Sequence, residues 1–427
     1  MQHHTRATFD AAELAVVLSY YDLGVIESVT ELTRGSRRSP KVGLVAERGK
    51  FLLKRRSIER AHPDRVRFVH RVQHHLVQSG FPLAPLVPTR DNQRTWVQLR
   101  EHIYELFRFM PGQAYARTVD ESRDAGASLA RLHWATTPFA SSHAATQLGP
   151  DYHDAPGVRT GLGAIGATLN AHDSFSGHES ELLFLTQYLL EAYNRAADAV
   201  NRLPFSSWPR RLIHSDWHPG NLLFRNGAVL AVIDYDSMRF SRRVVDVANG
   251  ALHFSIMAGE DPVDWPDHLD MDRYRAFLEG YDQYVPTVEA RLAFGAAGGH
   301  YIEGHGSSSP PVPVAESAVV AAAQTQPLST AETAGLMVDQ PSSETHDAAP
   351  VGGSAIHVAR PINLVGPLTL DERRCLPHLM VEAFIAECVT PIAATGSVGR
   401  WSGFRVMQMI RRKLDWIGSH IDSLVSG

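Results

Sequence analysis

Three polar residues in the second half of the chain have the types and spacing that phosphoryl transfer needs. Two of them lie in the segment His214–Asn221, with the sequence HSDWHPGN, and the third follows one apolar strand later, at Asp234. Asp216 can accept or orient the proton of a substrate hydroxyl. Asn221 and Asp234 supply oxygen ligands suited to Mg²⁺ on nucleotide phosphates. The pattern H-x-D-x-x-x-x-N, followed by this Asp, is typical of the catalytic and metal-binding half of a phosphoryl-transfer site.

A predicted hairpin would bring the two metal-binding candidates together. Leu222–Phe224 and Val229–Ile233 have the composition of strands, and Asn226-Gly227 between them is a typical two-residue turn. Asn221 would precede the first strand and Asp234 would follow the second, so they should be neighbours. Asp and Asn are also ordinary turn residues, and a surface hairpin without chemistry is the alternative. The joint spacing favours the metal site.

Lys54 is the expected phosphate contact. It ends the apolar run that begins at Phe51, which we expect to form the third strand of an amino-terminal sheet. Only four of the 41 basic residues are lysines, so chemistry explains a Lys in an apolar strand better than composition does. The alternative is a solvated Lys at a strand end, beside Arg55 and Arg56.

The segment Thr33–Ser39 has the position of a loop that covers nucleotide phosphates. It contains Gly35, Ser36 and three arginines, but it lacks the spacing G-x-G-x-x-G. The backbone N–H groups of Gly35 and Ser36 would bind phosphate if this loop has that role. A plain basic turn explains the segment equally well.

Tyr104–Met110 is the expected hinge between two lobes. Backbone N–H and C=O groups around Glu105 and Phe107 would hydrogen-bond adenine, and Leu106 or Phe107 would pack on the ring. This expectation rests on position in the chain, because apolar residues here would otherwise belong to the core.

One element of the pattern is missing. A site of this kind pairs its strand Lys with a Glu on the helix that crosses the sheet. The helix predicted to begin at Pro63 and to end before Gly80 has no Glu, and Glu59 lies just before it. If Glu59 does not reach Lys54, either another group positions Lys54 or this lobe is partly degraded.

Other acidic residues have simpler explanations. Asp246 is expected to cap the helix that it begins, Asp236 to bind metal or stand in solvent, and His214 to organise the loop backbone. The stretch 259–272 holds six acidic residues and could attract an amine to an acceptor pocket, but a solvated acidic loop explains it more simply.

Composition narrows the class of protein. The 427 residues are 44% hydrophobic and 20% charged, with a net charge of −5, so the chain has no overall basic field for nucleic acid. Two cysteines exclude a disulfide framework. The amino terminus does not resemble a secretory signal, and no apolar run suggests a membrane span. We expect a soluble, cytoplasmic protein; the sequence does not indicate its oligomeric state.

The elements predict an α+β fold with two lobes. Residues 1–108 read as a helix followed by an antiparallel sheet with one crossing helix, and 109–290 as a mainly helical lobe that carries the catalytic loop. Residues 291–366 contain Pro-, Ser-, Ala- and Gln-rich sequence, with no Lys or Arg between Arg291 and Arg360 and no aromatic residue between Glu303 and Arg360, and we expect a disordered insertion there. Helical periodicity resumes in 367–427, which we expect to complete the helical lobe.

These motifs together resemble the aminoglycoside phosphotransferase and choline kinase-like family, which includes type II homoserine kinases and has a protein-kinase-like fold. The matching segments are HSDWHPGNLLF, VIDYDS, YELFRFMPG, ASLARLHWAT and RVVDVAN. The resemblance covers about residues 1–290 and resumes near 367. It implies ATP-dependent phosphorylation of a small-molecule hydroxyl, with Asp216 as base, Asn221 and Asp234 on Mg²⁺, and Lys54 on the phosphates.

Two other functions compete with this one. The missing helix Glu would suit a catalytically weak pseudokinase that senses nucleotide. A protein kinase fits less well, because the WHPG spacer and the lack of an APE-like segment are closer to small-molecule kinases. Neither nucleic acid nor membrane is expected as a partner, and the sequence does not name the acceptor.

Overall fold

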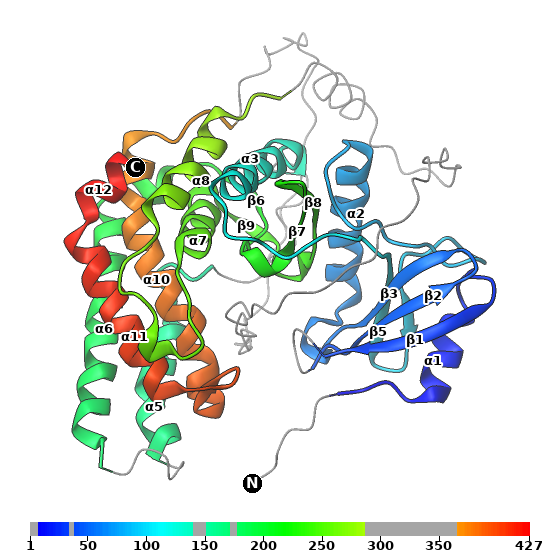
Figure 1. Ribbon diagram of the computed structural model, residues 1–427, viewed down its shortest axis with the longest axis horizontal. Helices are drawn as coiled ribbons and strands as arrows, with labels where there is room; N and C mark the ends of the chain where they lie inside the picture. Colours follow the sequence, from blue (N-terminus) through cyan, green and yellow to red (C-terminus); the bar gives the residue numbers. More distant parts are fainter. Residues whose placement is uncertain (1–6, 34–37, 140–150, 171–176, 287–364) are drawn as a thin grey trace, which may run out of the picture.

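The computed structural model describes residues 7–33, 38–139, 151–170, 177–286 and 365–427. Figure 1 shows a sheet-containing lobe formed by the amino-terminal part and a larger, mainly helical lobe formed by the rest. The helix α2 (Pro63–Gln78) stands between them. This is the predicted α+β arrangement. The expected phosphate-covering residues Gly35 and Ser36, and nearly all of the expected insertion at 291–366, lie outside the described residues.

The amino-terminal lobe is built on an antiparallel sheet with the strand order β1-β2-β3-β5-β4. The strands are β1 (Ile26–Leu32), β2 (Lys41–Ala46), β3 (Gly49–Arg55), β4 (Val97–Leu99) and β5 (His102–Arg108). Helix α1 (Ala11–Leu18) packs its apolar residues on this sheet and closes a separate small core. Glu13 of α1 accepts hydrogen bonds from Arg55 and Tyr104, each at 2.6 Å, and so ties the helix to β3 and β5.

Helix α2 begins with Pro63 in its first turn, as predicted, and ends before Gly80, which has φ +67. Its apolar face, including Val69, Val72 and Leu76, belongs to the same hydrophobic core as the helical lobe. The helix therefore packs more closely with the second lobe than with the sheet that precedes it.

The helical lobe contains two small antiparallel ribbons that carry the candidate site. One pairs β6 (Arg210–Ile213) with β9 (Arg239–Arg242), and the other pairs β7 (Leu222–Arg225) with β8 (Ala228–Val232). Helices α3 (Val119–Ala135) and α7 (Arg243–Ser255) pack against these ribbons, and α8 (Met271–Gln283) packs against α3 and α7. The ribbons are thus fixed on a helical base.

The remaining helices form the outer part of this lobe (Figure 1). They are α5 (Pro156–Asn170), α6 (Glu179–Asn201), α10 (Leu370–Thr395), α11 (Gly403–Ser419) and α12 (Ile421–Ser426), with the short ribbon β10 (Ser397–Val398) and β11 (Trp401–Ser402) between α10 and α11. Helix α10 packs on α5, α6 and α7, so the segment after residue 364 joins the core that contains the catalytic ribbons.

Among the described residues, α10 is long and apolar enough to cross a membrane, although no apolar run stood out in the sequence. Of its most apolar window, 67% is buried inside the protein. Packing against three other helices explains this apolar character, as expected for a core helix.

Candidate active site

The catalytic loop is fixed by a carboxylate from α7. Asp246 accepts hydrogen bonds from the backbone N–H groups of His214 and Ser215, both at 2.7 Å, and its carboxylate also lies 3.2 Å from His133 Nε2. Ser215 has φ +65, a left-handed conformation that costs energy for a non-glycine residue. The two hydrogen bonds from Asp246 hold the loop in this turn.

This arrangement corrects the expectation for Asp246. The residue at the N-cap of α7 is Arg242, and Asp246 lies one turn inside the helix. Its side chain leaves the helix and binds the loop after β6. Asp246 is therefore a positioning residue for the catalytic loop rather than a helix cap.

Asp216 and Asn221 contact each other directly. Asn221 donates its side-chain N–H groups to the Asp216 carbonyl at 3.0 Å and to the Asp216 carboxylate at 2.9 Å. Its nitrogen makes both bonds, and the side-chain oxygen of Asn221 accepts no hydrogen bond from the described residues, so it can bind a cation. The predicted base and one predicted metal ligand thus form a single unit.

His218 completes the surroundings of Asp216. The backbone N–H of Gly220 donates to His218 Nδ1 at 3.0 Å, so in the neutral ring the proton lies on Nε2. That atom is 3.5 Å from the Asp216 carboxylate. Burial lowers the pKa of His218, which favours the neutral ring. His218 thus faces Asp216 with an N–H group.

The predicted hairpin is confirmed. Leu222 pairs with Val232, and the turn residues Asn226 and Gly227 have φ +53 and +79, as a two-residue turn of this kind requires. The N–H of Ile233 donates to the Asn221 carbonyl at 2.9 Å. Asn221, just before β7, and Asp234, just after β8, therefore lie at the same end of the ribbon.

Lys54 connects the sheet of the first lobe to Asp234 and Asp236 in the second. Its ammonium donates to Asp234 at 3.0 Å and to Asp236 at 2.7 Å, and its side chain is only 7% exposed. Burial alone would lower the pKa of Lys54, but the two carboxylates raise it above its ordinary value. Burial would likewise raise the pKa of Asp234, whereas Lys54 and Lys41 lower it well below its ordinary value. Lys54 and Asp234 are therefore both charged at neutral pH.

The missing helix Glu has a replacement. Glu59 pairs with Arg38 at 3.1 Å on the protein surface, where both side chains are more than half exposed, so it does not position Lys54. Asp236 does so instead. Helix α2 reaches Asp236 through Arg65, which donates to the Asp236 carbonyl at 2.6 Å.

A buried ion network extends behind Asp236. Arg56 lies 2.8 Å from Asp236 and 2.7 Å from Glu105, and Glu105 also lies 2.5 Å from His70 Nε2. Arg56 and Glu105 are 1% and 0% exposed. Burial would raise the pKa of Glu105, but Arg56 and His70 lower it well below its ordinary value. The ion pairs Glu105–Arg56, Arg56–Asp236 and Asp236–Lys54 thus form one continuous buried chain that holds Lys54 in place.

The expected adenine contacts around Glu105 and Phe107 lie inside β5 rather than in a hinge. The Glu105 carboxylate belongs to the buried network, so this side chain is not available to a nucleotide. Strand β5 continues to Arg108, and Phe109 N–H still donates to the Lys50 carbonyl of β3 at 2.9 Å. The connection between the lobes begins only after this bond. The predicted hinge therefore starts several residues too early, and adenine binding by backbone groups here stays a prediction.

The acidic stretch 259–272 is largely neutralised by arginines. Asp267 accepts from Arg412 of α11 at 2.7 Å, Asp261 pairs with Arg405 of the same helix, and Asp270 caps α8. These bonds tie a surface loop to α11 and favour the simpler interpretation of the stretch over an amine-binding role.

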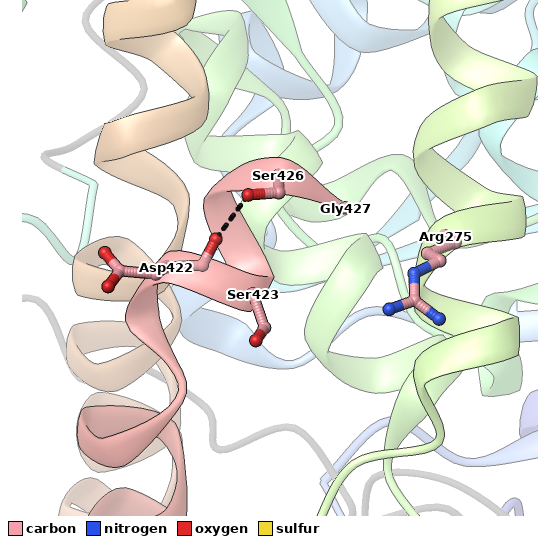
Figure 2. A pocket seen from close by; sticks show the side chains of 5 residues that line it. All are labelled: Arg275, Asp422, Ser423, Ser426 and Gly427. Atoms are coloured by element: carbon pink, nitrogen blue, oxygen red, sulfur yellow. Dashed lines mark hydrogen bonds between the residues drawn. The ribbon is translucent and has the colours of Figure 1, made fainter.

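A shallow hollow lies between α8 and the carboxyl terminus (Figure 2). Its lining residues are Arg275, Asp422, Ser423, Ser426 and Gly427. In Figure 2 the Asp422 carboxylate points away from Arg275, and Ser426 donates to the Asp422 carbonyl at 2.7 Å. None of these residues belongs to the catalytic loop, so the hollow is separate from the candidate active site.

The donor groups fit a nucleotide with a divalent cation. Among the described residues, no group of three or more His, Cys, Asp or Glu side chains could hold a metal by itself. Asn221 and Asp234 offer two oxygen donors, and Mg²⁺ commonly takes one or two protein oxygens and completes its shell with phosphates and water. Lys54 adds a positive charge directly beside them.

This fold and site define a kinase-like phosphotransferase: a sheet lobe that carries a buried Lys, and a helical lobe that carries Asp216, Asn221 and Asp234. The model of the phosphotransferase enzyme family, APH, matches residues 29–293, and the chain belongs to this family. The resemblance drawn from the sequence motifs is thereby confirmed. The protein is an enzyme of the small-molecule kinase class, which acts on hydroxyl groups.

Several homoserine kinases are similar over most of their length. The chain is 28% identical over 292 residues to the enzyme of Gluconacetobacter diazotrophicus, covering 66% of this chain and 82% of that protein. It is 23% identical over 277 residues to the enzyme of Zymomonas mobilis, covering 64% and 78%. These alignments, over 277 and 292 residues, are about as long as the region that the family model matches.

Two solved structures share the fold across nearly the whole chain. An aminoglycoside phosphotransferase from Alicyclobacillus acidocaldarius has a TM-score of 0.57 at 14% identity, covering 99% of this chain and 97% of the other. A microcompartment-associated aminopropanol kinase has a TM-score of 0.56 at 14% identity, covering 97% and 98%. At this identity the likeness concerns the fold, and it confirms the expected kinase-like architecture.

Proposed function

We propose that this protein is an ATP-dependent kinase that phosphorylates a hydroxyl group of a small amino alcohol, with homoserine-like molecules as the first candidates. The observation that carries the proposal is the meeting of Lys54, Asp234, Asn221 and Asp216 where the sheet lobe faces the catalytic ribbons. A nucleotide held by the first two residues would present its phosphates to a hydroxyl held by the last.

Asp216 is proposed as the group that orients and deprotonates the acceptor hydroxyl. Asn221 donates an N–H group to its carboxylate, and His218 directs an N–H group toward it, which fixes the direction of the carboxylate. The loop turn held by Asp246 fixes its position. In phosphoryl transfer the protein itself takes little part in covalent chemistry. Positioning of this kind therefore accounts for much of the rate enhancement.

Lys54 is proposed to bind the α- and β-phosphates, and Asp236 keeps its ammonium in place. Asn221 and Asp234 would hold Mg²⁺, which neutralises the charge of the phosphates when it is bound. Asp234 shares Lys54 with Asp236. Lys54 therefore keeps one carboxylate partner when Asp234 turns to the metal.

The relatives support an amino alcohol as acceptor. The similar curated proteins are homoserine kinases, and one structure with the same fold is an aminopropanol kinase. Homoserine and aminopropanol both carry an amine near a hydroxyl. An acceptor of this class would place its hydroxyl at Asp216.

ADP release by the purified protein tests the proposal. With ATP and Mg²⁺, we expect turnover with homoserine or 1-amino-2-propanol above the background without acceptor, and less with an aminoglycoside. Asp216→Asn should lower kcat by about 10²- to 10⁴-fold and leave the Kd of ATP within about twofold. Full activity of Asp216→Asn would remove Asp216 from the mechanism.

The alternative is a pseudokinase that binds nucleotide without turnover. The reason for considering it is the missing helix Glu. Asp236 supplies Lys54 with a carboxylate partner in place of that Glu. Tight ATP binding by the wild-type protein, without ADP release for any amino alcohol, sugar or aminoglycoside, would favour the pseudokinase.

A further inference from the structure

A second lysine faces the same carboxylate as Lys54. Lys41 is the first residue of β2 and lies directly opposite Lys54 in the register of β2 and β3. Residues directly opposite in a sheet point to the same face, so the two side chains extend toward the catalytic ribbons together. Figure 1 shows β2 and β3 as neighbouring strands of the sheet. These are two of the four lysines in the chain.

This pair is costly for the protein by itself. Like charges directly opposite each other in a sheet are destabilising. Lys41 is also mostly buried, with 20% of its side chain exposed, so part of its hydration is lost. A cation at this position needs an anion that offsets the repulsion from Lys54 and the lost hydration.

The carboxylate it faces does not fill that need. In the described part of the chain, Lys41 Nζ donates no hydrogen bond, and its one ion pair, with Asp234 Oδ2, is 4.0 Å long. That distance is too long for a hydrogen bond. Lys54, in contrast, makes two bonds to carboxylates, at 3.0 and 2.7 Å. The donors of Lys41 are therefore available, while those of Lys54 are largely used.

Metal binding would leave Lys41 without even this partner. The inference rests on the proposed function, in which Asp234 becomes a ligand of Mg²⁺. An Asp234 carboxylate on a divalent cation has little negative charge left for Lys41, whereas Lys54 keeps Asp236. Asp234 would hold the metal against the outer phosphates of the nucleotide, so the anions nearest to Lys41 would be the β- and γ-phosphates.

We propose that Lys41 is a second phosphate-binding residue, which exchanges its long contact with Asp234 for the β- and γ-phosphates of the bound nucleotide. Lys54 and Lys41 then hold the phosphate chain between two adjacent strands. Lys54 binds the α- and β-phosphates, and Lys41 binds the β-phosphate and the γ-phosphate that is transferred.

Equilibrium binding of ATP, ADP and AMP to Lys41→Met tests this assignment. Loss of a charged hydrogen-bond donor should raise the Kd of ATP and ADP by about 10- to 100-fold. The Kd of AMP should change by less than about threefold, because AMP has only the α-phosphate that Lys54 binds. Lys41→Arg, which keeps the charge, should stay within about threefold of wild type for all three nucleotides.

The melting temperature without nucleotide separates this role from a structural one. If Lys41 binds phosphate, Lys41→Met should melt at or above the wild-type temperature, because a buried and repelled cation is replaced by an apolar side chain of similar length. Lys50→Met is the matched control, since Lys50 lies on β3 with an exposed side chain and should change neither property.

Two results would overturn the inference without touching the proposed function. One is an unchanged ATP affinity of Lys41→Met. The other is an equal loss of affinity for ATP and AMP together with a lower melting temperature, which would make Lys41 a structural partner of Asp234. A wild-type protein that binds no ATP at all would overturn the proposed function itself, and this inference with it.

Discussion

The ammonium of Lys54 lies 2.7 Å from the carboxylate of Asp236, two residues after Asp234. In a typical site of this class the partner of the strand Lys is a Glu on the crossing helix, and helix movement makes or breaks the pair. Here the partner belongs to the same segment as the candidate metal ligand. The position of Lys54 is therefore coupled directly to that segment, and indirectly to α2 through the bond from Arg65 to the Asp236 carbonyl.

Asp236→Asn should weaken both the fold and nucleotide binding. Asp236 is 4% exposed and contacts both Lys54 and Arg56, so its loss leaves two buried cations short of one negative charge. Breaking a buried ion pair from one side costs about 3–5 kcal/mol. We expect a loss of this size in the free energy of unfolding, measured with urea, and a higher KM for ATP.

Glu59→Gln is the matched comparison for Asp236→Asn. Glu59 lies just before α2 and is the alternative partner considered for Lys54, but its pair with Arg38 is on the surface. Exposed pairs contribute about 0–1 kcal/mol, so Glu59→Gln should change stability and KM very little. A larger effect from Glu59→Gln than from Asp236→Asn would show that Glu59, and not Asp236, positions Lys54.

Sequence reasoning succeeded where the partners are close in the chain. The ribbon from Asn221 to Asp234 spans 14 residues, and its turn residues, its strands and its polar ends are all visible in the local pattern. The order of strands and helices, and the position of α2, could also be predicted, because periodicity and Pro or Gly signals are local.

The partners that were missed are distant in the chain. Lys54 and Asp236 are separated by 182 residues, and Ser215 and Asp246 by 31, so no local pattern indicates either contact. The hinge was placed too early because composition shows that β5 is a strand but not where its last sheet bond is made. Lys41 had a usable signal: the scarcity of lysine that singled out Lys54 applies to it equally.

Asp246→Asn should disorder the catalytic loop. The amide nitrogen of Asn is a donor, and at one of the two carboxylate positions it would face the N–H of His214 or Ser215. Each lost bond between a charged group and the backbone contributes about 1.5–3 kcal/mol. We expect lower stability in urea and a fall in kcat with little change in the Kd of ATP, because Lys54 and Asp236 are untouched. A normal kcat in Asp246→Asn would show that the loop keeps its turn without this carboxylate.

Gly126→Ala should strongly destabilise the helical lobe. A Cβ at Gly126 of α3 would lie 1.9 Å from the Phe277 carbonyl oxygen of α8, and backbone cannot move aside as a flexible side chain can. The two helices would have to separate, and we expect a loss of several kcal/mol in the free energy of unfolding, on the order of a severe overpacking change.

Gly163→Ala on α5 is the control for this packing argument. Among the described residues, no atom outside the backbone of α5 lies within 4 Å of a Cβ at Gly163, so only the helix propensity changes. Replacing an exposed helical Gly with Ala stabilises by about 0.5–1 kcal/mol. Opposite signs for the two Gly→Ala changes, measured by urea unfolding, would confirm the close crossing of α3 and α8; equal small effects would contradict it.

The stability of the helical lobe should depend on pH through His253 of α7 and Glu387 of α10, whose side chains lie 2.8 Å apart. Burial alone would lower the pKa of His253, but Glu387 raises it above its ordinary value of about 6.5. The folded state therefore binds the proton more tightly than the unfolded chain. Its stabilising contribution is complete below about pH 6.5 and is lost as the pH rises through the folded-state pKa.

Glu387→Gln measures this contribution, because it removes the carboxylate and leaves the size of the side chain nearly unchanged. The wild type should exceed the variant in the free energy of unfolding by on the order of 1 kcal/mol more at pH 6 than at pH 9. Comparing the two proteins cancels the other histidines, which are common to both. A difference between wild type and variant that stays constant from pH 6 to pH 9 would mean that His253 is not charged in the folded protein, and that the contact between α7 and α10 is held by packing alone.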